Sequence, residues 1–464
     1  MTRADRSRLP AVGPDPAFRL PDRARHRLAN GLEVRTVEHP TMPVVTMVVQ
    51  VDGGTGADPA DREGLAAMTA DLVDEGTGSM SALDVSDAIA RIGGDFDLDV
   101  GSDSTTFTLT TLTRFATRGV ALLADLVIRP SLREADFERG RQLRLDRLRQ
   151  LKDAPAAVAE RAFLRLLYGT HPYGHLAIGN DASLRAMALE ETVRFHAETF
   201  RPDRATVVIS GAMRHDALLA LADSAFGSWT ATHAQGTTAP PAAAIVPSAS
   251  APRLAVVARE GAAQSELRLG HLCARRDTPD YSELLVMNAV LGGQFVSRIN
   301  LKLREEKGYT YGARSGFDWR RGLAPFSIHA GVHTAATADA IRDAINEFDE
   351  IRGGRPATED ELVLAKASLT RGFPRNFETA QQVARGVAQL ALYGLPDNYF
   401  EEFVARTNAV TTADVTRVAQ QYLHPEQLTT LIVGDLAAIG GTLDGLGLGA
   451  AQVLPADPDP APAH

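Results

Sequence analysis

The chain has 464 residues, 44% of them apolar and 23% charged, which is typical of a globular protein and long enough for two or more domains. The net charge of −10 argues against binding to nucleic acid or to an anionic membrane, since both require a basic surface. The single cysteine, Cys273, excludes an intramolecular disulfide and a thiolate metal cluster.

Targeting signals are absent from the sequence. No apolar run approaches the roughly 18 residues of a transmembrane helix. The N-terminal residues are rich in Arg, Pro and Asp and lack the apolar centre of a secretory signal. We therefore expect a cytoplasmic protein without a membrane span. Cys273 lies in an alternating, strand-like segment, so we expect a packed thiol and not a nucleophile.

The first part of the chain alternates between strand and helix patterns. Residues 1–21 are expected to be a disordered lead-in, and 22–230 to form a first domain. The β-branched run at 43–51 predicts a buried strand. Apolar spacing predicts further elements, namely helices over 64–73, 83–92, 114–127, 134–152, 155–167 and 189–199, and strands over 96–100, 107–112 and 205–211.

The second part of the chain repeats the first. Residues 231–251 are small, Pro-rich and uncharged, which predicts a linker. A shift of 223 residues lays the landmarks of 194–211 over 417–434, and several landmarks with one offset indicate a duplication. We therefore expect two similar α+β halves, the second over 252–446, followed by a disordered tail over 447–464.

A helix-to-strand turn in the second half brings a cation close to a phenol. Helices are predicted over 282–290 and 297–306, and Gly308 suits the helix C-cap because glycine tolerates positive φ. A strand is expected to begin at Tyr309, so Arg304 and Tyr311 flank the turn. A capped helix with one packed aromatic side chain explains the same pattern without any function.

Several short motifs occur in a fixed order and spacing in both halves. They are Asn30-Gly31-Leu32, Gly64-Leu65-Ala66, His171-Pro172-Tyr173-Gly174, Pro202 to Gly211, Leu291-Gly292-Gly293, Ser297-Arg298-Ile299-Asn300, Leu303 to Phe317 and Ala409-Val410-Thr411. In this order and spacing they resemble the insulinase/pitrilysin peptidases, especially the two-domain members akin to mitochondrial processing peptidase, from about Arg27 to Leu436. The resemblance implies two homologous halves, each a mostly antiparallel sheet with helices packed on it, that form a half-clamshell.

In those peptidases, an inverted His-x-x-Glu-His helix binds zinc and supplies the general base, and a later Glu completes the site. The equivalent segment here has Ala67 and Asp71 in place of the histidines and Ala70 in place of the glutamate. The region of the later ligand contains Arg147, whose charge would repel zinc. We therefore expect no metal in this chain.

Two histidine pairs have four-residue spacing, but neither has the context of a metal site. His171 and His175 enclose Pro172 and Gly174, which predicts a loop. His329 and His333 lie in a strand-like segment, where four residues span about 13 Å, too far for one metal ion.

The resemblance also gives Arg304 and Tyr311 a role. In the family, an Arg and a Tyr seven residues later face the zinc site across a closed chamber, where they hold the substrate backbone and stabilise the tetrahedral oxyanion. Tyr309 is the second choice of tyrosine. Gly292 and Gly293 are expected to contact the substrate beside the chamber, although a simple turn is equally compatible with them. The cluster of Arg314, Arg320 and Arg321 is expected to be a solvated surface.

The resulting hypothesis is that the chain is the non-zinc subunit of a heterodimeric metallopeptidase. Its partners would be a homologous subunit that carries His-x-x-Glu-His and zinc, and the peptide substrate. No peptidase activity is expected from the chain alone. The alternatives are a structural homologue like the core proteins of respiratory complexes, and a peptide-binding module that does not cut.

Overall fold

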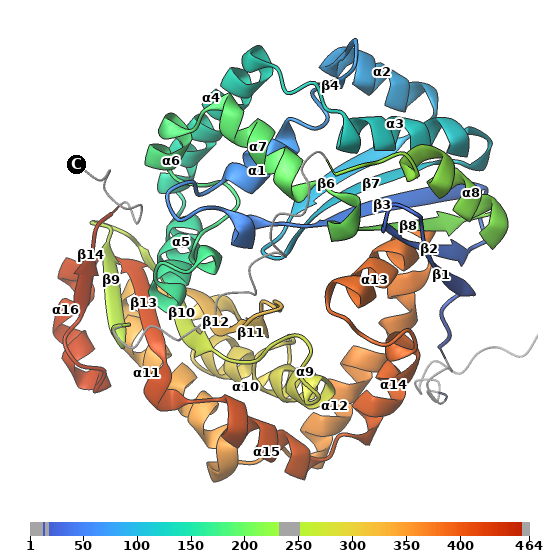
Figure 1. Cartoon of the computed structure of the whole chain (residues 1–464). Helices are drawn as coiled ribbons and strands as arrows, with labels where there is room; N and C mark the ends of the chain where they lie inside the picture. Colours follow the sequence, from blue (N-terminus) through green and yellow to red (C-terminus); the bar gives the residue numbers. More distant parts are fainter. Residues whose placement is uncertain (1–12, 14–17, 232–250, 457–464) are drawn as a thin grey trace, which may run out of the picture.

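The computed structural model describes residues 13, 18–231 and 251–456, and they form two halves that lie opposite one another (Figure 1). The first half contains the strands β1 (Arg23–Arg27), β2 (Glu33–Glu38), β3 (Val44–Asp52), β4 (Gly76–Thr77), β5 (Met80–Ser81), β6 (Asp95–Val100), β7 (Ser104–Leu112) and β8 (Ala205–Gly211). Its helices are α1 (Leu65–Asp71), α2 (Ala82–Arg91), α3 (Ala116–Ile128), α4 (Glu134–Lys152), α5 (Pro155–Tyr168), α6 (Asp181–Ala186), α7 (Leu189–Thr199) and α8 (His215–Phe226).

The second half has a corresponding set of elements. Its strands are β9 (Leu254–Ala258), β10 (Gln264–Leu272), β11 (Thr310–Phe317), β12 (Pro325–His333), β13 (Thr429–Gly434) and β14 (Gln452–Leu454). Its helices are α9 (Tyr281–Leu291), α10 (Arg298–Asn300), α11 (Thr337–Asp349), α12 (Glu359–Thr370), α13 (Ala380–Leu392), α14 (Tyr399–Ala409), α15 (Thr412–Tyr422) and α16 (Leu436–Leu443), together with the π-helical segments Leu301–Glu306 and Glu350–Gly354.

The two main sheets have the same plan. The first has the order β1-β2-β8-β3-β7-β6, and the second, read from its far edge, has the order β14-β9-β13-β10-β12-β11. In each sheet most neighbours are antiparallel, while β2 with β8 and β9 with β13 are parallel. The expected α+β fold of two homologous halves is confirmed. The duplication is visible in α7 and α15, whose bounds differ by the predicted shift of 223 residues.

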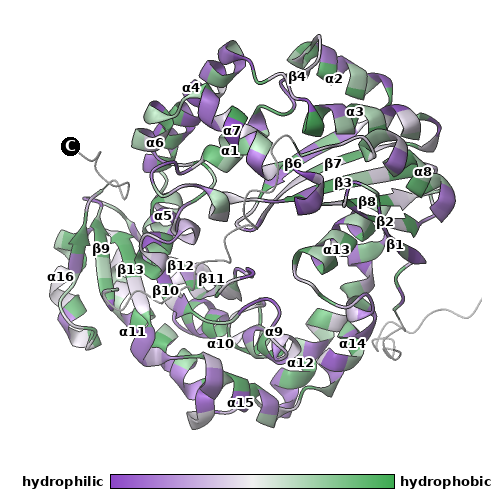
Figure 2. Cartoon of the chain, in the orientation of Figure 1, coloured by the Kyte–Doolittle hydropathy of each residue, from purple (hydrophilic) through white to green (hydrophobic). Residues whose placement is uncertain are grey.

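Each sheet is covered on one face by a helix from the other half. The helix α5 of the first half packs on β10 and β13, and α13 of the second half packs on β3 and β8 (Figure 1). In Figure 2 the strands β9 and β13 are largely hydrophobic, as strands buried on both faces should be. The contact of α13 is made by buried apolar side chains, namely Val383, Ala384, Val387 and Ala388 against Val37, Val48 and Val208.

A loop of the second half fastens the two halves together. The guanidinium of Arg320 lies 5.0 Å from the ring centres of both Tyr168 and Tyr173, and the side chain is buried. Arg321 forms an ion pair of 2.8 Å with Asp52 of β3. The expectation of a solvated surface is therefore wrong for Arg320 and Arg321, because both point into the first half. Arg314 is exposed, as expected.

Both ends of the described chain are more ordered than predicted. In the expected lead-in, Phe18 and Leu20 pack against a cluster of the second half that includes Phe373. In the expected tail, β14 pairs in parallel with β9. The prediction of disorder is wrong for these segments, because their apolar side chains or backbone groups have partners that are distant in sequence. The remaining residues of both ends, and 232–250 of the expected linker, lie outside the described residues.

The thiol of Cys273 is packed, as predicted. Its Sγ lies 3.4 Å from the carbonyl oxygen of Tyr422, and burial raises its pKa to about 12. None of the described helices combines the length and apolar character that crossing a lipid bilayer requires.

Val387→Ala should lower the free energy of unfolding by about 2 kcal/mol, because it removes two buried methyl groups from the contact between α13 and the first sheet. The matched control is Val363→Ala on α12, where the side chain is 60% exposed and the expected change is under about 0.5 kcal/mol. Urea denaturation followed by circular dichroism measures both. Equal losses in the two variants would contradict the role given to this contact.

Candidate functional site

The segment from Arg304 to Tyr311 forms the predicted helix-to-strand turn. The helix ends in the π-helical turn Leu301–Glu306, and Gly308 has the positive φ of +64° that its place after the helix requires. The amide of Gly308 donates to the carbonyl of Arg304 at 3.1 Å. π-Helical turns are rare and frequently mark functional sites.

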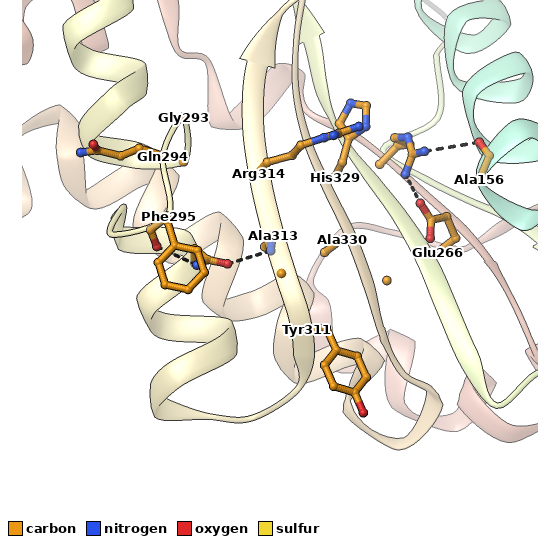
Figure 3. Close-up of a pocket in the computed structure, with 15 residues that line it drawn as sticks. Ala156, Glu266, Gly293, Gln294, Phe295, Tyr311, Ala313, Arg314, His329 and Ala330 are labelled. Carbon is orange, nitrogen blue, oxygen red and sulfur yellow. Dashed lines mark hydrogen bonds and ion pairs between the residues drawn. The ribbon is translucent and has the colours of Figure 1, made fainter. Parts of the chain in front are cut away.

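A β-bulge aims the side chain of Tyr311. Thr310 pairs with Val332 and Ala313 with Ala330, so two residues of β11, Tyr311 and Gly312, lie opposite one residue of β12. The hydroxyl of Thr310 fixes the bulge, because it lies 2.7 Å from the carbonyl oxygen of Gly331 and accepts from the amide of Gly312 at 3.0 Å. The side chain of Tyr311 is 87% exposed and extends away from the strand (Figure 3).

Arg304 is held in place by an aromatic ring. Its guanidinium carbon lies 4.4 Å from the centre of the Phe295 ring, within cation–π distance. Its Nη1 is buried and makes no hydrogen bond, and the nearest carboxylate oxygen in an ion pair is Glu305 Oε1 at 3.5 Å. This nitrogen therefore keeps hydrogen-bonding capacity, because its one charged partner lies at ion-pair distance and makes no hydrogen bond to it.

A hollow of about 560 Å³ lies along β11 and brings several predicted residues together (Figure 3). Tyr311, Gly292 and Gly293 line it, whereas Arg304 does not and only contacts the ring of Phe295, which does. We name it the β11 hollow. Its other lining residues are Ala156, Glu266, Arg268, Gln294, Asn300, Gly312, Ala313, Arg314, His329, Ala330 and Gly331.

Tyr309 is not in the β11 hollow. Its half-buried ring packs against the core of the second half. The structure therefore separates the two candidate tyrosines: the phenol of Tyr311 is free to meet a ligand, whereas that of Tyr309 lies at the edge of the core.

The two glycines form a tight backbone contact with β11. The carbonyl of Gly292 accepts from the amide of Ser315 at 2.9 Å, and a Cβ on Gly292 would lie 2.3 Å from Ser315 Oγ and 2.8 Å from Ser315 Cβ. A Cβ on Gly293 would lie 2.5 Å from the amide nitrogen of the Asn288 side chain. Glycine is required at both positions because the end of α9 touches the strand.

Asn300 joins the glycine loop to the bulge. Its Oδ1 accepts from the amide of Ala313 at 3.0 Å, and its Nδ2 donates to the carbonyl of Phe295 at 2.7 Å. Neither Asn300 nor Phe295 was predicted as a site residue. The one hint of a site role in the sequence is their position, since both lie in the segment between the predicted site residues Gly292 and Arg304. Their roles depend on contacts that the sequence does not display.

Three basic side chains form a row across the floor of the β11 hollow. Arg314 of β11 lies opposite His329 of β12, which lies opposite Arg268 of β10. Burial, reinforced by the two arginines, lowers the pKa of His329 to about 3, so the imidazole is neutral at physiological pH. Arg268 is buried and paired with Glu266 at 2.6 Å. The hollow therefore favours ligands that offer oxygen atoms or negative charge.

The predicted counterpart of the zinc helix, α1, contains one carboxylate and no histidine. Ala67 and Ala70 of α1 are buried and have no donor atoms. Asp71 is occupied by Arg144 of α4, whose Nη2 and Nε lie 2.7 and 2.9 Å from Asp71 Oδ2. Arg147, also on α4, is exposed and donates to Gln150. The donor set does not fit a zinc ion, because a guanidinium occupies the carboxylate that remains.

The other carboxylates near α1 do not change this result. Asp74 lines a hollow beside Asp71 and Arg144, and its pKa is raised to about 6 by burial and by the neighbouring Glu75 and Asp71. Glu75 is paired with Arg139. Within the described residues, no cluster of three or more His, Cys, Asp or Glu side chains could hold a metal ion.

The two histidine pairs also serve other purposes. His171 caps the short helix Pro172–Gly174, and His175 contacts Asp58 at 2.9 Å. Asp58 in turn accepts from the amides of Gly64 and Ala66 at 2.7 and 2.6 Å and so fixes the start of α1. His329 and His333 lie on the strand β12, as predicted.

Comparison with family models gives two matches along the chain. Residues 33–180 match the model described as Insulinase (Peptidase family M16), and residues 187–369 match the model described as Peptidase M16 inactive domain.

Relatives match nearly the full length. An uncharacterized zinc protease of Mycobacterium tuberculosis is 28% identical over 410 residues, covering 88% of this chain and 92% of that protein. A probable mitochondrial-processing peptidase subunit beta of Schizosaccharomyces pombe is 23% identical over 443 residues, covering 92% and 93%. The structure of a peptidase M16 inactive domain from Pseudomonas fluorescens shares the fold with a TM-score of 0.82 at 22% identity, covering 89% of this chain and 98% of that one.

Gly292→Ala should destabilise the protein by about 1–3 kcal/mol, because the new methyl group overlaps Ser315 on β11. Gly316→Ala is the matched control, since a Cβ there meets nothing within 4 Å. Thermal unfolding followed by circular dichroism gives the two values. If Gly292→Ala were as stable as Gly316→Ala, the close approach of the glycine loop to β11 would be refuted.

The buried neutral His329 should make stability depend on pH. Below the ordinary histidine pKa of about 6.5 the unfolded chain takes up a proton that the folded protein, with a pKa of about 3, does not. The free energy of unfolding should therefore fall as the pH drops from 7 to 5, by up to about 2 kcal/mol from this residue.

Urea denaturation at several pH values checks this dependence in the wild type and in His329→Gln. The variant should lose part of the pH dependence, whereas His333→Gln, at an exposed position of the same strand, should keep it. An unchanged pH dependence in His329→Gln would contradict the assignment.

Proposed function

Because the chain belongs to the insulinase family of peptidases, we propose that it is the non-zinc subunit of a heterodimeric metallopeptidase. In this proposal it supplies Arg304 and Tyr311 to hold the peptide, and a homologous subunit with an intact His-x-x-Glu-His helix supplies zinc and cuts. The chain itself needs no cofactor, and the compartment is the cytoplasm.

The observation that carries the proposal is the contrast between the two halves. At the position of the zinc helix, an ion pair between Asp71 and Arg144 joins α1 to α4. In the second half, the bulge that exposes Tyr311 and the stacking that holds Arg304 are both present. These two features support the proposal because they position the side chains of Arg304 and Tyr311 without a metal site in the same half.

The chemistry expected of the pair follows from its donors. Arg304 carries a fixed positive charge, and the phenol of Tyr311 is a neutral donor on a rigid strand edge. Preorganised donors of this kind stabilise negative charge that develops on a carbonyl oxygen when water attacks a peptide bond. In the row that lines the same hollow, His329 is neutral and Arg268 is paired with Glu266, so the exposed Arg314 adds the favourable charge for peptide carbonyl oxygens.

The relatives support a role in peptide cleavage within an assembly. Several are described as zinc proteases, and the Schizosaccharomyces pombe protein is described as one subunit of a processing peptidase. A structural homologue would instead be incorporated in a larger complex without using Tyr311, and a peptide-binding module would bind peptides without a partner.

Co-purification from the native cell tests the partnership. A chain with an intact His-x-x-Glu-His motif should be recovered in equal amount, and zinc should be found in the pair but not in this chain alone. Stoichiometric zinc bound to the purified chain would contradict the proposal.

Tyr311→Phe in the reconstituted pair should lower kcat/KM for peptide cleavage by about 100-fold, because one oxyanion donor is lost. Arg304→Ala should have an effect of similar size. Tyr309→Phe is the matched control and should leave activity unchanged, since that ring packs against the core. Each variant is reconstituted with the zinc-bearing subunit, and its kcat/KM for peptide cleavage is measured. Full activity of the Tyr311→Phe pair would favour a purely structural role for this chain.

A further inference from the structure

A second hollow, of about 440 Å³, lies at the open edge of the first sheet. It is lined by β6 and β7 of the first half and by α13 and Trp319 of the second half. We name it the β6 hollow. Because β6 and β11 are the corresponding edge strands of the two sheets, the β6 and β11 hollows occupy related places in the duplicated fold.

A row of three polar side chains crosses the β6 hollow. Asp99 of β6 lies opposite Thr106 of β7, which lies opposite Gln50 of β3, so all three lie on one face of the sheet. Within the described residues, none of the three side chains makes a hydrogen bond or an ion pair. Gln50 is 4% exposed and lines the hollow. A nearly buried amide without a partner is unusual, because such groups normally find one inside the protein.

The other carboxylates of the β6 hollow already have partners. Asp97 is paired with Arg385 of α13, and Asp318 with Arg320. Asp103 accepts hydrogen bonds from the hydroxyl of Tyr173 and, at 2.8 Å, from the amide of Arg321. Among the carboxylates that line the hollow, Asp99, whose side chain is exposed, is therefore the one with neither a hydrogen bond nor an ion pair in the described structure.

Aromatic side chains also line the β6 hollow, namely Trp319 and Tyr393. Trp319 is stacked on Phe317, and the guanidinium of Arg276 lies 5.6 Å from the ring centre of Tyr393, so this side of the hollow already accommodates a cation beside an aromatic ring. The ion pair between Arg385 and Asp97 already shows that a guanidinium from the second half is accepted beside this strand.

We propose that the β6 hollow binds the guanidinium or ammonium group of an arginine or lysine side chain of a peptide. Asp99 would supply the counter-charge, and the amide oxygen of Gln50 and the hydroxyl of Thr106 would accept further hydrogen bonds. Because the ligand is taken to be a peptide, the assignment rests on the proposed function, but it concerns a different surface from Arg304 and Tyr311.

The test uses the isolated full chain and two fluorescent serine–alanine peptides that differ in one central residue, arginine or its uncharged isostere citrulline. Fluorescence anisotropy should show that the arginine peptide binds roughly tenfold more tightly, as a charge-assisted hydrogen bond predicts, and less so at high salt. Asp99→Asn should abolish this preference. Arg385→Gln should increase it, because Asp97 then also lacks a partner.

The matched control is Asp95→Asn, which removes the same charge from the same strand at a position that does not line the hollow. It should keep the preference. The assignment is overturned if neither peptide binds, if the two peptides bind equally, or if Asp95→Asn loses as much as Asp99→Asn.

Arg304→Ala separates this assignment from the proposed function. The preference for arginine should persist in that variant, because the β6 hollow does not include Arg304. Loss of the preference in Arg304→Ala would overturn a separate cation site, whereas full activity of the Arg304→Ala pair would overturn the proposed function alone.

Discussion

The exchange of α5 and α13 between the halves is the constraint on which the rest of the structure depends. A sheet with two apolar faces must be covered on both, and here each half covers one face of the other half's sheet. Each half has its own main core on one face of its sheet, but the other face of each sheet is buried only by the helix from the other half. The same exchange leaves β6 and β11 as uncovered edges, and both candidate binding surfaces lie at those edges.

The duplicated edges have diverged in charge. On the second sheet the row Arg314, His329 and Arg268 is basic, and on the first sheet the row Asp99, Thr106 and Gln50 is acidic and polar. In the binding roles that we propose, Arg314 would attract peptide carbonyl oxygens to β11, and Asp99 would attract a basic side chain to β6.

A single side chain connects three segments of the first half. Arg144 contacts Asp71 twice and also donates to the carbonyl of Ala177 at 2.9 Å, so it links α1, α4 and the segment before α6. A guanidinium supplies several directed hydrogen bonds from one group. The carboxylate of Asp71 therefore has a partner within the chain.

The sequence by itself determined the duplication, most helices and strands of the first half, the lack of His and Glu at positions 67, 70 and 71, and the spacing of Arg304 and Tyr311, because periodicity, turn residues and motif order are local properties. The helices α11, α13 and α14 of the second half were not predicted. The sequence could not show that Arg320 and Arg321 are inserted into the first half, that Asp71 is paired with Arg144, or that Phe295 and Asn300 support the site. Only the tertiary structure decided these points. Each depends on two segments far apart in sequence, and a contact between such segments leaves no local pattern to read.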